Sequence, residues 1–161
     1  MSTLAHVALG SNLGDRLASL RRAASALADH PDLVVAAASS IWESAPAPPA
    51  EEGDPAFLNA VLRLQSRLTA DDLLDLLLSI EADQGRVRPG PRTIDLDLLT
   101  FGDLVSDRPE LTLPHPRMTD RAFVLRPLLE VSPDPRWAAA LERLGPDGAC
   151  ARQATMRLGV A

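Results

Sequence analysis

The sequence contains no lysine, and its 16 positive side chains are all arginines. A Walker A phosphate loop requires a lysine, so any nucleotide chemistry must hold phosphates in another way. Aromatic residues make up 3% of the chain and the net charge is −6. Because neither a broad basic face nor a set of base-stacking side chains is available, we expect no nucleic-acid binding.

Cysteine and long apolar runs are also scarce. The single cysteine, Cys150, excludes an internal disulfide and a multi-cysteine zinc site, which agrees with a reducing compartment. No stretch approaches the roughly 20 apolar residues of a membrane span, and Met1 to Gly10 lacks the basic flank and apolar centre of a signal peptide. We therefore expect a cytoplasmic protein that does not bind membranes. A monomer is our working expectation, which no residue pattern carries.

The length of 161 residues fits one domain spanning 1–161. Apolar periodicity predicts strands at 4–9, 34–41, 57–68 and 93–101, and helices at 13–30, 69–84, 120–129 and 136–144. The order strand, helix, strand, strand, helix, strand predicts an α+β fold: a ferredoxin-like βαββαβ antiparallel sheet with helices on one face, plus C-terminal helices.

Several finer expectations accompany this assignment. A proline-rich loop should start at Glu43, and the 57–68 strand should be covered on one face only. Thr69 should cap the second long helix, and Thr119 or Asp120 the third. We expect the tail after Leu144 to be loosely held.

Asp95 and Asp97 carry the sharpest local signal. On a strand they share one face, while Ile94, Leu96 and Leu98 point into the core. Two adjacent carboxylates repel each other, and a hard divalent cation such as Mg²⁺ relieves that repulsion while leaving positions open for phosphate and water. An ordinary solvated strand face is the alternative, although aspartate is disfavoured in strands.

Cationic side chains flank this pair. Arg86, Arg88 and Arg92 lie within seven residues, and guanidinium groups suit phosphate oxygens. A solvated loop that pairs with nearby acidic residues explains the cluster equally well. His115 stands between two prolines on a stiff loop, with Arg121 shortly after it, so it could donate to a phosphate or be structural.

A flat heterocycle is commonly held between aromatic rings, with an amide such as Asn59 reading its edge. Phe57 and Phe123 are candidates for the rings, and Ser44 and Pro46 in the proline-rich loop are candidates for the rim. The residues alone leave the two phenylalanines as ordinary core residues.

Four strings together resemble the 6-hydroxymethyl-7,8-dihydropterin pyrophosphokinase family. They are Ala8-Leu9-Gly10-Ser11-Asn12-Leu13-Gly14-Asp15, Phe57-Leu58-Asn59-Ala60, Gly90-Pro91-Arg92-Thr93-Ile94-Asp95-Leu96-Asp97 and Leu113-Pro114-His115-Pro116-Arg117-Met118. The resemblance runs from about Leu4 to about Pro133 and leaves the C-terminal tail unassigned. It implies a ferredoxin-like fold and attack of the pterin hydroxymethyl oxygen on the β-phosphorus of ATP, with release of AMP, in folate biosynthesis.

The resemblance also implies roles for single residues. Asp95 and Asp97 would bind a pair of Mg²⁺ ions with ATP. The expected ATP contacts are Arg86, Arg92, His115 and Thr112, and the expected catalytic cations are Arg86, Arg92 and Arg121. The expected pterin contacts are Ser44, Pro46, Ala47, Phe57, Asn59 and Phe123.

This chain departs from the family pattern between Arg88 and Gly90. Only Pro89 lies there, whereas family members often have several more residues, including a tryptophan that closes over the substrates. A shorter loop would form a truncated lid, which bears on the role of Arg88 and on closure. Pro116 also stands where an aromatic residue is common in some members.

Two other functions remain open on the residues. One is a non-catalytic ferredoxin-like module that binds a small molecule. Such a module would not need Asp95 and Asp97 in combination with the arginine loop. A metal-dependent phosphohydrolase would use the same carboxylates with water as the nucleophile, and would release phosphate from ATP without a pterin.

Overall fold

The computed structural model describes residues 1–46, 53, 55–85, 93–146 and 150–160. Within them the chain forms eight strands, four α-helices and one 3-10 helix, η1. In chain order they are β1 (Thr3–Ser11), α1 (Arg16–Ala28), β2 (Leu33–Ala38), β3 (Ile41–Ser44), β4 (Phe57–Ser66), α2 (Ala70–Asp83), β5 (Asp95–Phe101), β6 (Ser106–Arg108), β7 (Leu111–Leu113), η1 (Met118–Asp120), α3 (Ala122–Val131), α4 (Pro135–Leu144) and β8 (Cys150–Gln153).

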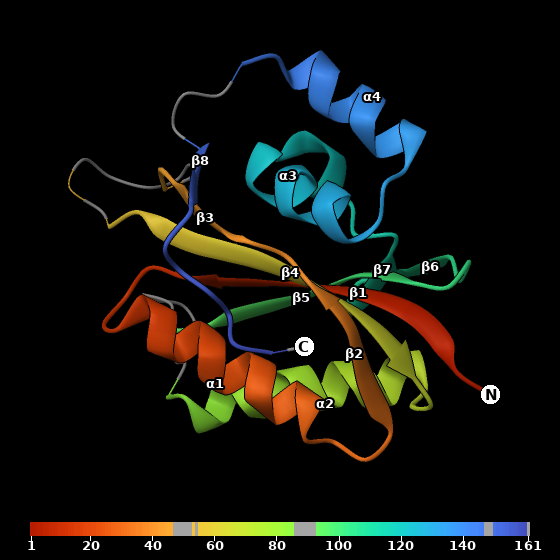
Figure 1. Ribbon diagram of the computed structural model, residues 1–161. Helices are drawn as coiled ribbons and strands as arrows, with labels where there is room; N and C mark the ends of the chain where they lie inside the picture. Colours follow the sequence, from red (N-terminus) through yellow and green to blue (C-terminus); the bar gives the residue numbers. More distant parts are fainter. Residues whose placement is uncertain (47–52, 54, 86–92, 147–149, 161) are drawn as a thin grey trace.

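Six of the strands make one antiparallel sheet. Its order is β5-β1-β4-β3-β8, and β2 also pairs with β4. Helices α1 and α2 cover one face, and α3 and α4 lie over the other (Figure 1). Each pair of helices shares an apolar cluster with the sheet. Leu20 of α1 and Leu77 of α2 belong to the first cluster, and Val61 of β4 and Leu125 of α3 belong to the second. The ferredoxin-like α+β prediction is therefore confirmed.

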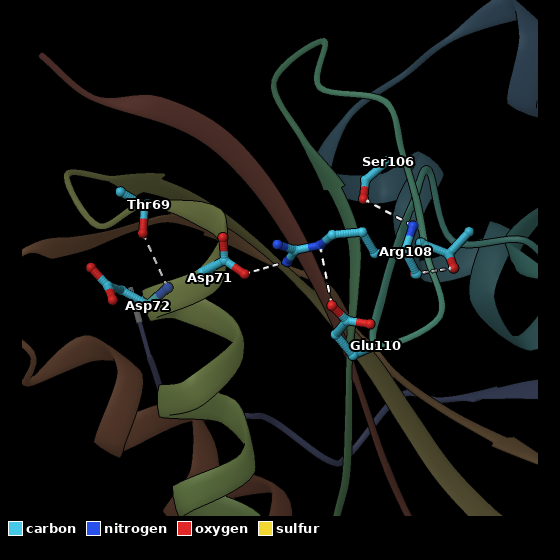
Figure 2. A network of polar contacts seen from close by, with 7 residues as sticks. Thr69, Asp71, Asp72, Ser106, Arg108 and Glu110 are labelled. Carbon is cyan, nitrogen blue, oxygen red and sulfur yellow. Dashed lines mark hydrogen bonds and ion pairs between the residues drawn. The ribbon is translucent and has the colours of Figure 1, made fainter.

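Three of the four α-helices have a side-chain N-cap, and before α4 this is Asp134, whose Oδ1 accepts a hydrogen bond from the Arg136 N–H at 2.8 Å. Asp15 Oδ1 accepts a hydrogen bond from the Ala18 N–H at 3.1 Å at the start of α1. Thr69 Oγ1 accepts one from the Asp72 N–H at 3.1 Å at the start of α2, as predicted (Figure 2). The predicted cap at Thr119 or Asp120 is wrong, because Met118–Asp120 forms η1 and α3 begins only after Arg121, without a side-chain cap.

The small β6–β7 hairpin was not predicted, since its strands have three residues each. Figure 2 shows how it is fastened to α2: the Arg108 guanidinium contacts Asp71 in the first turn of that helix, and also Glu110 at 3.4 Å. The hairpin leads directly into the segment that carries His115, whose N–H donates to Leu99 O at 2.8 Å and so holds that segment beside β5.

The predicted strand at 34–41 is wrong in its continuity. The chain forms β2 and then β3, because the Ser39 N–H donates to Val61 O at 3.0 Å while Ser39 Oγ accepts the Val61 N–H at 2.8 Å. This local pairing separates the β2–β4 ladder from the β3–β4 ladder. Glu43 and Ser44, expected in the proline-rich loop, belong to β3 instead.

Two further expectations are wrong. Strand β4 is covered on both faces, because Leu62 packs under α1 and α2 while Val61 packs under α3 and α4. The described part of the tail at 150–160 is not loosely held, since β8 pairs with β3 from Cys150 to Gln153 and Leu158 is 4% exposed in the core. Among the described residues, no helix has the length and apolar character needed to cross a membrane.

Candidate active site

Strand register places the polar residues of three strands in one row. Gly10 of β1 pairs with Asn59 of β4 on one side and with Asp95 of β5 on the other. Ala8, two residues earlier on β1, pairs with Asp97. Because side chains two apart on a strand point to the same face, both aspartates and Asn59 face the α3 side of the sheet.

A cavity of about 220 Å³ lies over this row. Its walls come from β1, β3, β4 and β5 below and from α3 and the segment before it above. Among the predicted site residues it brings together Ser44, Phe57, Asn59, Asp95, Asp97, Arg121 and Phe123. The cavity thus joins two carboxylates, a guanidinium, an amide and two aromatic rings.

Asn59 is held firmly in this wall. It is 4% exposed, and its Nδ2 donates to Ser44 Oγ at 2.8 Å and to Trp42 O at 3.2 Å. A methyl group placed on Gly10 would lie 3.6 Å from both Asn59 Oδ1 and Phe57 Cδ1. The amide orientation is therefore fixed, with its oxygen beside Gly10 at the cavity wall.

Asp95 and Asp97 lie on β5, an edge strand that is held in place by its buried side chains and by a hydrogen bond to α2. Ile94, Leu96 and Leu98 are buried in the core as predicted, and the Leu96 N–H donates to Glu81 Oε2 of α2 at 2.9 Å. Asp97 is half-buried. Two carboxylates that border a cavity fit Mg²⁺, which is usually bound through one or two carboxylates together with substrate phosphates and water.

His115 lies next to the aspartates. Its Nε2 is 3.9 Å from Asp97 Oδ1, and its Nδ1 accepts the Arg117 N–H at 3.2 Å. Burial, and then the charge of Arg121, hold the pKa of His115 below its ordinary value, although Asp95 acts in the opposite direction. In the neutral ring the Nδ1 acceptor role places the proton on Nε2, which faces the carboxylate.

Cations border the cavity on the α3 side. Arg121 precedes α3 directly, and its guanidinium carbon lies 5.6 Å from the centre of the Phe123 ring. Arg117 also lines the cavity, and the sequence reasoning did not single it out. Its position two residues after His115, on the same stiff segment, was the available signal.

The remaining candidates lie elsewhere. Thr112 is not among the residues that line the cavity, and its hydroxyl donates to Arg108 O at 2.9 Å. Pro46 is half-buried next to Ala45, which does border the cavity. The predictions for Ala47, Arg86, Arg88 and Arg92 fall outside the described residues.

Comparison with known proteins decides the family. Residues 6–133 match the family described as 7,8-dihydro-6-hydroxymethylpterin-pyrophosphokinase (HPPK). The chain belongs to this family. The 2-amino-4-hydroxy-6-hydroxymethyldihydropteridine pyrophosphokinase of Pseudomonas aeruginosa is 45% identical over 81% of this chain and 82% of its own length. The protein of the same name from Bacillus subtilis is 42% identical over 81% of this chain and 79% of its own.

Solved structures support the HPPK fold. A chain titled HPPK-DHPS in complex with substrates superposes with a TM-score of 0.69 over 88% of this chain, at 12% identity. A wild-type HPPK-DHPS from Plasmodium falciparum gives a TM-score of 0.64 over 89%. This chain spans less than half of either one, 43% and 44%. At such identities the likeness shows the fold alone.

Proposed function

We propose that this HPPK-family chain transfers the pyrophosphoryl group of ATP to the hydroxymethyl group of 6-hydroxymethyl-7,8-dihydropterin, releasing AMP, in folate biosynthesis. The match of residues 6–133 to the family carries this proposal. The cavity supports it, because two carboxylates, two guanidinium groups and two aromatic rings border one space.

The pterin ring is assigned to the cavity end formed by Phe57 and Phe123. Asn59 and Ser44 would read the polar edge of the ring. Both Nδ2 hydrogens of Asn59 are donated within the protein, so Asn59 Oδ1 would accept from the ring and the Ser44 hydroxyl, which accepts from Asn59, would donate to it. Backbone groups near Pro46 and Ala47 would complete this rim. The hydroxymethyl arm would then point along the row of paired residues toward Asp95.

The triphosphate is assigned to the side of the cavity that carries the charged groups. Asp95 and Asp97 would hold a pair of Mg²⁺ ions, whose charge, when bound, offsets that of the phosphates. Arg121 would contact the transferred group and His115 the ATP phosphates. Arg86 and Arg92 are assigned to the same phosphates by the family pattern, and Thr112 to the neighbourhood of the nucleotide.

In the reaction the pterin hydroxyl oxygen forms a bond to the β-phosphorus and the bond from that phosphorus to the α-phosphate oxygen breaks. The hydroxyl proton leaves to solvent or to a phosphate oxygen. Phosphoryl transfer passes through a loose transition state, so alignment and charge neutralisation do most of the work and no strong general base is needed. ATP and the pterin are the proposed partners, with a cytoplasmic monomer as the proposed form.

Product analysis tests the reaction. The purified chain is incubated with ATP, Mg²⁺ and the pterin. Nucleotides and pterins are then separated by chromatography and identified and quantified by mass spectrometry. We expect one AMP for each pterin diphosphate, and neither product when the pterin or Mg²⁺ is omitted. ADP or phosphate formed without the pterin would indicate the phosphohydrolase, and ligand binding without turnover would indicate the non-catalytic module.

A further inference from the structure

Arg16 joins the ends of the two strands that lead into the proposed pterin pocket. Its Nη1 donates to Glu43 Oε2 at 2.8 Å and to the backbone oxygen of Ala56 at 2.9 Å. Glu43 directly precedes Ser44, and Ala56 directly precedes Phe57. One guanidinium nitrogen therefore ties together the neighbours of two proposed pterin contacts.

These contacts lie on the sheet face opposite the pocket. Glu43 pairs with Leu58, which packs in the core under α1, while Ser44 pairs with Phe57, which borders the cavity. Successive side chains on a strand alternate between faces. Arg16 thus contacts β3 and the approach to β4 from below, and the next residue of each strand points up into the pocket.

The position along the ladder matters as well. The pairing of β3 with β4 ends at Ser44 and Phe57. Among the described residues beyond this last rung, 45–46 and 55–56, no pairing between the two segments fixes their separation. The hydrogen bonds from Arg16 to Glu43 and Ala56, called here the Arg16 bridge, supply a fastening at that point.

Helix stability does not account for an arginine here. Arg16 is the first residue of α1, where the positive end of the helix dipole disfavours a cation. The side chains of Arg16 and Glu43 are 28% and 36% exposed, and ion pairs with this much solvent access stabilise a fold only weakly. The bridge is better placed to set the strand spacing than to stabilise the chain.

We propose that Arg16 is a positioning residue for the pterin pocket. By fastening the end of β3 to the residue before β4, it keeps the last rung, Ser44 with Phe57, closed and in place, and thereby raises the affinity for the pterin. The ATP side of the site, built on β5 and the segment before α3, does not depend on the bridge. This inference rests on the proposed function.

The test compares Arg16→Gln with a matched control, Arg67→Gln. Arg67 also donates to a backbone carbonyl, Pro31 O, at 2.9 Å and forms an ion pair with a carboxylate, Asp32 Oδ1, at 3.3 Å. It follows Ser66, the last residue of β4, so it lies about 30 Å from Phe57 along the strand. The two variants lose the same chemistry at opposite ends of β4.

We expect Arg16→Gln to raise the KM for the pterin about tenfold, because Ser44 and Phe57 would no longer be held in the geometry that fits the ring. The KM for ATP should change less than about twofold, and Arg67→Gln should leave both constants within that range. Arg16→Lys, which keeps the charge and a donor, should fall between Arg16→Gln and the unaltered chain. An unchanged pterin KM in Arg16→Gln, or equal rises for pterin and ATP, would overturn the proposal.

A double-mutant cycle with Glu43→Gln identifies the partner. If the bridge acts as a unit, Arg16→Gln combined with Glu43→Gln raises the pterin KM no more than Arg16→Gln alone; multiplied effects would contradict it. Amide hydrogen exchange gives a readout that needs no turnover. Exchange at Ser44 and Phe57 should be faster in Arg16→Gln and unchanged in Arg67→Gln. This measurement tests the role of the Arg16 bridge even if no pterin-dependent AMP forms and the proposed function is wrong.

Discussion

Two rows of cross-strand partners, one near each end of the same sheet face, carry polar side chains, but the two rows have different surroundings. At one end Asp95, Gly10 and Asn59 pair across β5, β1 and β4 and border the candidate active site. At the other end Thr100, His6 and Arg63 pair across the same strands, so the difference must come from what lies above them.

At the His6 end the polar groups bond within the protein. His6 Nδ1 and Nε2 lie 2.7 Å from the hydroxyls of Thr100 and Ser132, and Trp137 of α4 packs edge-on against the ring at 5.5 Å. Arg63 Nη1 donates to Val131 O at 2.6 Å. A wider hollow borders this end, and His6, Arg63 and Thr100 are among the residues that line it.

At the Asp95 end the helical layer contributes a different set of groups. Arg121 and Phe123, where α3 begins, border the cavity, whereas the end of α3 and the start of α4 cover His6. The comparison teaches that polar register alone does not make a site. A site also needs complementary groups from the second layer, because the hollow beside His6 is the wider of the two.

The largest expected effect is the loss of activity when a carboxylate at the Asp95 end is removed. Asp97→Asn keeps the size of the side chain but removes the charge that would hold Mg²⁺, so we predict a fall in kcat of about 1,000-fold or more. Pterin-dependent AMP formation is the measurement, with the midpoint of thermal unfolding recorded alongside. Asp103→Asn, just beyond the far end of β5, is the matched control and should keep its activity; equal losses would mean that the position of the carboxylate is irrelevant.

The next effect concerns stability at the His6 end. Burial, and then the charge of Arg63, lower the pKa of His6 from 6.5 to about 4. As the pH falls, the unfolded chain therefore takes up this proton before the folded one does. The contribution of His6 to stability is complete above about pH 6.5 and is lost as the pH falls toward 4, by an amount on the order of 3 kcal/mol.

Urea unfolding at a series of pH values checks this, with His6→Gln and His30→Gln compared. His6→Gln should lose the part of the pH dependence between 4 and 6.5, and His30→Gln should retain it. A His6→Gln chain with the full pH dependence would contradict the assignment. Activity near neutral pH should survive in any His6→Gln protein that is folded, because His6 does not border the candidate site.

The smallest effects come from a matched pair of glycines. A methyl group at Gly10 meets ordinary contacts at 3.6 Å and projects toward Phe57 and Asn59, so Gly10→Ala should raise the pterin KM about tenfold with little loss of stability. Gly102 has a φ of +54°, and a methyl group there would lie 2.9 Å from Thr3 Cγ2. Gly102→Ala should therefore cost about 1–2 kcal/mol of stability and leave the pterin KM unchanged.

Steady-state kinetics and thermal unfolding on both glycine variants separate these outcomes. The result that would undo the comparison is a crossed pattern, in which Gly10→Ala loses stability and Gly102→Ala loses pterin affinity.

Local patterns in the sequence predicted the features that depend on local geometry. Alternation along β5 placed Asp95 and Asp97 on one face and Leu96 in the core, and Thr69 caps α2 as expected. Features that depend on distant segments could not be read in this way. The break at Ser39 requires its partner Val61, and β8 requires the edge of β3.

The candidate site shows the same division. Nothing local distinguishes Phe57 and Phe123 from core residues, and only the family resemblance singled them out. The structure brings both rings to one cavity from segments that lie far apart in the sequence. Arg117 and Gly10 escaped notice as single site residues because their importance comes from the second layer and from cross-strand pairing.

The central claim is that the Asp95 end, not the His6 end, binds both substrates. A crystal structure with Mg²⁺, a non-hydrolysable ATP analogue and the pterin tests it most directly. We predict metal ions on Asp95 and Asp97, and the pterin ring between Phe57 and Phe123 with its hydroxymethyl oxygen in line with the β-phosphorus. A pterin or nucleotide seated in the hollow beside His6, with the two aspartates free of metal, would contradict it.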